Sequence, residues 1–125
     1  MASELRVNTL KDASGNNSVA TSTVANGSAK VSVDCTPSGT TNTTFNVSSA
    51  TDGDTGITTI NISSSLASAT EPVQATIHND GTENRCIVAQ NTSASAVLTK
   101  AFAASNGTVT DGAVDFSLVA HGDLA

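Results

Sequence analysis

The sequence contains no tryptophan and no tyrosine, and only three of its 125 residues are phenylalanine. A core anchored by large aromatic side chains is therefore excluded. Basic residues are also scarce, with five lysines and arginines against eleven acidic residues, and they are scattered along the chain. Nucleic-acid binding depends on basic side chains that neutralise phosphates, so we do not expect it. No apolar run approaches 18 residues, which argues against insertion into a membrane.

Only two residues are cysteine, Cys35 and Cys86, and no CxxC pair is present. A metal site built on them is therefore not expected. Residues 1–12 carry charged side chains and lack the apolar segment of a secretory signal, so the chain is expected to fold in the cytoplasm or to leave without such a signal. Its thiols are then expected to be reduced where the chain is made. We predict that both cysteines are small buried hydrophobic residues. A disulfide between them is the alternative.

Small and hydroxyl-bearing residues are abundant. Serine and threonine make up more than a quarter of the chain, and much of the 38% apolar content is alanine. Alanine buries little area, so the core must be thin at about 25 cal/mol per Å² of apolar surface. Small proteins with poor cores commonly associate with copies of themselves. The composition therefore predicts a single small domain, or a stalk and a small head, that forms a homo-oligomer.

Apolar and polar residues alternate along most of the chain, which is the pattern of half-buried strands. The alternating runs cover residues 4–8, 30–35, 45–48, 58–62, 73–78, 86–88 and 114–120. Turn-forming residues separate them at positions 12–17, 37–39, 52–56, 79–81 and 106–107. The pattern predicts an all-β fold of seven to nine strands.

Helix has little support in this sequence. Residues 63–71 could form one short helical turn before Pro72, whereas residues 94–104 suit a strand better. A boundary is expected near residues 25–28, because the first 25 residues hold too few bulky apolar side chains for a core of their own. Such a segment can pack as a hairpin against copies of itself. We therefore divide the chain into an N-terminal segment, residues 1–28, and a head, residues 29–125.

Candidate chemical groups are few. Asp52 and Asp54 lie in an Asp/Gly-rich stretch whose spacing resembles a calcium loop, but it lacks the remaining ligands of an EF-hand, so a simple turn is the preferred interpretation. His78 and His121 belong to no metal-binding motif and are expected in surface loops. The chain has no Gly-x-Ser-x-Gly elbow, and we expect no enzymatic activity, no cofactor and no metal.

The sequence also resembles a known group of proteins. The opening MASELRVNTLKDASGNNSVATSTVANGSAK, residues 1–30, resembles the opening of small tail-fibre-like structural proteins of bacteriophages, especially those of marine bacteria. FNVSSATDGDTGITTINIS, residues 45–63, looks like the β-hairpin that those proteins carry next, and the ending FSLVAHGD is similar in type. Members often carry aromatic residues soon after the GSAK element and at the position of Ile57. Their absence here implies a repacked head core.

The resemblance implies a virion component made in the host cytoplasm, a homotrimer with an extended N-terminal hairpin and a small β-sandwich-like head. The residues expected to trimerise it around a threefold axis are Leu5, Val7, Leu10 and Val19. Polar loops holding Asp52, Asp54, Asn79, Asp80 and Asn91 are expected to contact the host surface, including its glycans. The other expected partners are virion proteins of the tail or capsid.

Two alternatives to a tail-fibre-like appendage stay open. A capsid decoration protein on the head lattice would have similar composition and size. A monomeric carbohydrate-binding module could use strand faces lined with threonine, asparagine and glutamine, although the lack of tryptophan and tyrosine argues against the usual platform for stacking on sugars.

Overall fold

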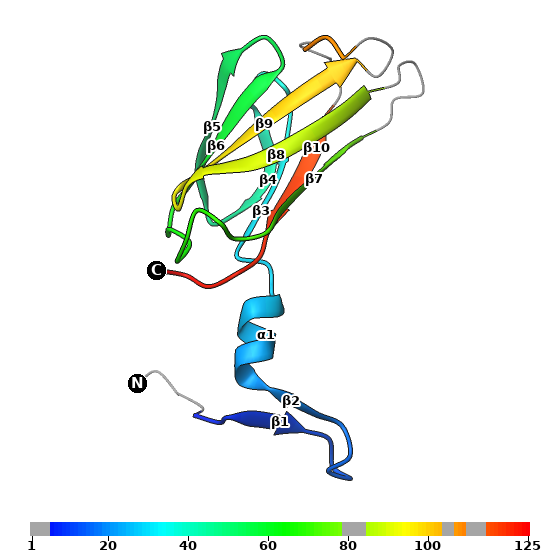
Figure 1. Ribbon diagram of the computed structural model, residues 1–125, viewed down its shortest axis with the longest axis vertical. Helices are drawn as coiled ribbons and strands as arrows, with labels where there is room; N and C mark the ends of the chain where they lie inside the picture. Colours follow the sequence, from blue (N-terminus) through cyan, green and yellow to red (C-terminus); the bar gives the residue numbers. More distant parts are fainter. Residues whose placement is uncertain (1–5, 79–84, 104–106, 110–114) are drawn as a thin grey trace.

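The computed structural model describes residues 6–78, 85–103, 107–109 and 115–125. The chain forms a β-rich head above a narrow N-terminal part, which we call the stem and define as residues 6–28 (Figure 1). The stem holds two short strands and a helix: β1 (Thr9–Lys11), β2 (Ser18–Ala20) and α1 (Thr21–Gly27). None of the described residues belongs to a helix long and apolar enough to cross a bilayer.

The described residues of the head form two four-stranded antiparallel sheets. The strands of the first sheet lie in the order β4 (Thr41–Phe45), β3 (Val31–Cys35), β10 (Phe116–Ala120) and β7 (Val73–Ile77). The strands of the second sheet lie in the order β5 (Val47–Asp54), β6 (Ile57–Ile62), β9 (Ala96–Ala103) and β8 (Arg85–Ser93). The predicted all-β fold is therefore confirmed, although the described residues form ten strands rather than the seven to nine predicted.

The core lies between these sheets. It is formed by the apolar side chains that alternate with polar ones along the strands. β3 and β10 of the first sheet bury every second residue, and β6 and β9 of the second sheet face them with alternate side chains. Within the part of the chain that the structure describes, the buried apolar residues are Val31, Val33, Cys35, Ile60, Ile62, Leu66, Val97, Phe116, Leu118 and Ala120. Phe116 is the one aromatic residue among them, so the core is made mainly of aliphatic side chains.

Asn46 marks the point where the chain leaves the first sheet for the second. Its φ is 58°, and its side-chain amide donates to the carbonyls of Lys30 and Ser64 at 3.0 and 2.9 Å. The prediction of one strand over residues 45–48 is therefore wrong. Phe45 ends β4 and is 58% exposed, while Val47 begins β5, because the left-handed turn at Asn46 separates the two strands.

Two expectations about helix also fail. Residues 63–71 form no helix; Leu66 is fully buried instead, and its backbone N–H donates to the Ala94 carbonyl at 2.8 Å. Tertiary contacts thus override the local preference of this segment. Helix α1 (Thr21–Gly27) was not predicted from the sequence; in the structure it buries no residue and has no side-chain N-cap hydrogen bond.

The stem hairpin pairs β1 with β2, and Leu10 lies opposite Val19. Asp12 organises its turn: Oδ1 accepts from the Ser14 hydroxyl at 2.9 Å and from the Asn16 N–H at 3.0 Å, and Oδ2 accepts from the Asn17 amide at 2.7 Å. These donors favour the carboxylate, so the pKa of Asp12 is lowered. The hairpin is held by local polar contacts.

Candidate functional site

The residues expected to trimerise the chain lie in the stem. Val7, Leu10 and Val19 are 40%, 42% and 38% exposed, and Leu5 lies outside the described residues. Val24 of α1, which the sequence analysis did not single out, is 45% exposed. Thr21 alone among the described stem residues is even half-buried. The apolar side chains of the stem therefore gain little cover from their own chain.

The described residues among those expected in surface-contact loops do not form one site. Asp52 and Asp54 are exposed in β5, near its turn into β6 at the end of the head away from the stem (Figure 1). Asn91 was expected in a loop, but it lies half-buried in β8, where its amide donates to the Glu71 carbonyl at 2.6 Å. That prediction is wrong because β8 extends to Ser93. Asn79 and Asp80 lie outside the described residues.

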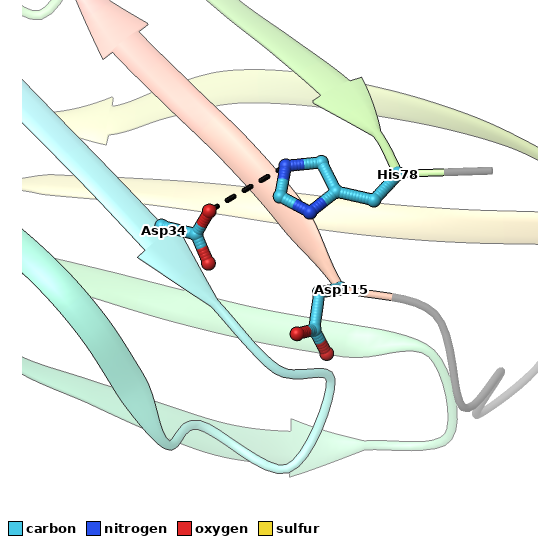
Figure 2. A group of neighbouring side chains, drawn as sticks. All are labelled: Asp34, His78 and Asp115. Carbon is cyan, nitrogen blue, oxygen red and sulfur yellow. Dashed lines mark ion pairs between the residues drawn. The ribbon is translucent and has the colours of Figure 1, made fainter. Parts of the chain in front are cut away.

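The structure instead brings together three groups that the sequence analysis did not connect. Asp34 of β3, His78 just after β7 and Asp115 just before β10 each offer a ligand atom, and these atoms all lie within 4.8 Å of one another (Figure 2). His78 Nε2 lies 3.5 Å from Asp34 Oδ2. The His78 side chain is 44% exposed and that of Asp34 27% exposed. We call this group the Asp34–His78–Asp115 cluster.

Strand register explains the convergence. β10 lies between β3 and β7, and Ser117 is opposite both Asp34 and Thr76. Because Cys35 and Phe116 point into the core, the alternate residues of these strands project from the outer face of the first sheet. The His78 N–H donates to the Asp115 carbonyl at 2.8 Å and continues the ladder by one step. Three segments distant in sequence thereby present side chains to one place.

Two polar residues hold the cluster. The strand register shifts between Asp34 and Cys35, so Asn42 is the extra residue of a bulge in edge strand β4. Its amide donates to Asp34 Oδ1 at 2.8 Å and reaches Asp115 Oδ2 at 3.4 Å. The Ser117 hydroxyl lies 2.7 Å from His78 Nε2 and 3.4 Å from Asp34 Oδ2. Asn42 and Ser117 therefore orient the Asp34 carboxylate, and Asn42 also contacts the carboxylate of Asp115.

His121 occupies a different environment, at the junction of head and stem. Its Nδ1 donates to the Gly27 carbonyl at 3.1 Å. An open hollow beside it is lined by Asn26, Glu71, Pro72, His121, Gly122 and Asp123. His78 is exposed, as expected of a surface histidine, whereas His121 is half-buried against the last turn of the stem.

The two cysteines are both free thiols, so the alternative of a disulfide is wrong. Cys35 is fully buried, as predicted, but Cys86 is exposed in edge strand β8, contrary to the prediction. The alternation of β8 points Ile87, rather than Cys86, toward the core. Burial, followed by the nearby charges of Asp115 and Asp34, raises the pKa of the Cys35 thiol to about 11.

No family model matches the sequence, and comparisons with curated proteins and with solved structures also give no match.

Proposed function

We propose that this chain is a non-enzymatic structural protein of a bacteriophage virion, a homotrimeric, tail-fibre-like surface appendage. In this proposal residues 1–28 trimerise and attach the protein to other virion proteins, and residues 29–125 form the outward-facing head. The observation that carries the proposal is the stem, which exposes Val7, Leu10, Val19 and Val24 and has no buried residue of its own.

A segment of this kind needs partners. Exposed apolar side chains gain free energy when copies of the stem cover one another, and each two-stranded hairpin is marginal in water by itself. Intertwined hairpins would also cover the free edges of β1 and β2, which are otherwise open to aggregation. Together with the resemblance of residues 1–30 to tail-fibre-like proteins, this favours a trimeric stem.

The head suits display at a surface. The turn between β5 and β6 lies at the end opposite the stem, and Asp52 and Asp54 there are exposed (Figure 1). A stem that attaches at one end leaves this polar end free to contact a host cell-surface glycan. Capsid decoration is the alternative within the same structural role, with the stem then attached to the head lattice.

Light scattering after size exclusion tests the oligomer. We expect a mass near three times 12.4 kDa that is stable to dilution. A folded monomer would overturn the trimeric stem and would favour a stand-alone carbohydrate-binding module. An antibody against the purified protein, applied to virions, tests the role itself. Labelling in tens of copies at the tail supports an appendage, hundreds of copies on the head indicate decoration, and unlabelled virions contradict both.

A further inference from the structure

We propose that the Asp34–His78–Asp115 cluster is a binding site for a divalent transition-metal ion, with Zn²⁺ as the best-matched ion. This inference does not depend on the proposed virion role. It rests on the convergence of one imidazole and two carboxylates from three neighbouring strand ends of the first sheet (Figure 2).

The spacing of the ligand atoms fits one ion. Three atoms that lie within 4.8 Å of one another share a point no farther than about 2.8 Å from each of them. Bonds from Zn²⁺ to histidine nitrogen or carboxylate oxygen are about 2.0–2.2 Å long. Closing the site therefore requires each ligand atom to move by less than about 1 Å. His78 is exposed, so a small side-chain rotation suffices to bring its ring nitrogen in.

The ligand chemistry selects the class of ion. Calcium and magnesium prefer ligand sets made only of oxygen, whereas imidazole suits zinc and other first-row divalent ions. Three protein ligands leave a fourth tetrahedral position for water or for a group from a partner. The dipositive ion would also offset the two converging carboxylates in a chain whose net charge is −6.

The surrounding residues resemble an outer ligand shell. The Asn42 amide donates to Asp34 Oδ1 and reaches Asp115 Oδ2, so it contacts both carboxylates. When Nε2 of His78 binds the ion, the Ser117 hydroxyl can donate to Asp34 Oδ2, from which it lies 3.4 Å. Ser117 thus keeps a hydrogen-bond partner in Asp34 when the ion replaces its contact with His78 Nε2. Outer partners of this kind orient the ligands and strengthen binding.

An ion at this position would join three strands that are far apart in sequence. β3 is the first described strand of the head, β7 lies in its middle and β10 is the last, and the cluster lies where β7 ends and β10 begins, away from the stem (Figure 1). Because the ion binds only the folded arrangement, it would stabilise the head. We expect Zn²⁺ to raise the thermal midpoint of unfolding by several degrees and EDTA to reverse the increase.

Calorimetric titration of the tag-free full chain with Zn²⁺ tests the site, with native mass spectrometry to count bound ions. We expect one ion per chain, and at least tenfold weaker binding for His78→Gln and for Asp115→Asn. Asn42→Ala is expected to weaken binding about tenfold, because Asn42 positions the ligands. Matched controls are His121→Gln, which removes the other histidine, and Asp52→Asn, which removes an exposed carboxylate.

Either of two results would overturn the proposal. One is a full chain that takes up no Zn²⁺ at millimolar concentration. The other is binding that His78→Gln leaves unchanged or that His121→Gln lowers equally. Circular dichroism of each variant checks the fold, and the exposed position of His78 makes its variant the decisive one. Replacing Zn²⁺ with Co²⁺ adds an optical readout, since the visible bands of bound cobalt should disappear in His78→Gln.

Discussion

Replacing Val19 with aspartate tests whether the stem holds the oligomer together. Val19 lies opposite Leu10 in the β1–β2 hairpin, and both side chains are about two-fifths exposed. An aspartate at this position leaves the hairpin hydrogen bonds in place, because those bonds come from the backbone. The substitution therefore acts mainly on whatever covers Val19 in the assembled protein.

The size of the effect follows from the exposed fractions. Full burial of a valine or leucine side chain contributes about 1.5–3 kcal/mol. With 38% of Val19 left to cover, the oligomer gains roughly 0.6–1.1 kcal/mol per chain from it, or roughly 2–3 kcal/mol per trimer. Three carboxylates brought close to a threefold axis repel one another by about 1 kcal/mol per pair even in water. Since about 1.4 kcal/mol is tenfold, we expect Val19→Asp to lower the trimer association constant at least a hundredfold.

The assay is molar mass by light scattering over a dilution series. Val88→Asp is the matched control, because Val88 is also a strand valine and is 51% exposed, but it lies in β8 of the head. We expect Val19→Asp to dissociate on dilution and Val88→Asp to keep the mass of the unaltered protein. The opposite outcome, dissociation of Val88→Asp with an intact Val19→Asp oligomer, would refute a stem-based assembly and indicate contact through the head.

Four further predictions test the head. Leu118→Ala, at the centre of β10 and 1% exposed, should lower the free energy of unfolding by about 2–5 kcal/mol in urea titration. Asn46→Ala should cost about 2–4 kcal/mol, because it adds left-handed strain to lost hydrogen bonds, and Asn46→Gly, which tolerates the positive φ, should cost less; equal costs would contradict a role for the turn. Iodoacetamide at pH 8 should modify the exposed Cys86 and spare the buried Cys35. The pKa of the Cys35 thiol rises from 9.0 to about 11 on folding, so the unfolded chain loses the thiol proton at lower pH than the folded chain. The contribution of the protonated thiol to the free energy of unfolding should therefore be complete below pH 9 and be lost between pH 9 and 11. Cys35→Ala should remove that fall in urea titrations across this range, and Cys86→Ser should preserve it.

Local patterns were sufficient to predict several strands. The alternation in residues 31–35 and 116–120 correctly placed Cys35 and Leu118 inside, because side chains of a strand point to opposite faces at every step. The turn at residues 12–17 was also predicted correctly, since Asp12 and its neighbours hydrogen-bond within the turn. These features depend on interactions between residues that are close in sequence.

Other local patterns gave wrong predictions because tertiary contacts decided the outcome. The run at 45–48 reads as one strand, yet Asn46 turns the chain between sheets with hydrogen bonds to Lys30 and Ser64. Cys86 alternates like a buried residue, but β8 packs its opposite face, which carries Ile87 and Ala89, against the core. In both positions the deciding partner lies far away in the sequence.

The sequence by itself determined the all-β character and the thin aliphatic core. It also determined that the N-terminal segment has too few apolar residues for a core of its own. Composition and period-two alternation are local properties, so they can be taken directly from the sequence. The tertiary structure alone decided the order of the strands and the meeting of Asp34, His78 and Asp115. Those three residues become neighbours through the register of β3, β10 and β7. Register between strands distant in sequence is set by packing of the whole sandwich, which the alternation of any single strand does not specify.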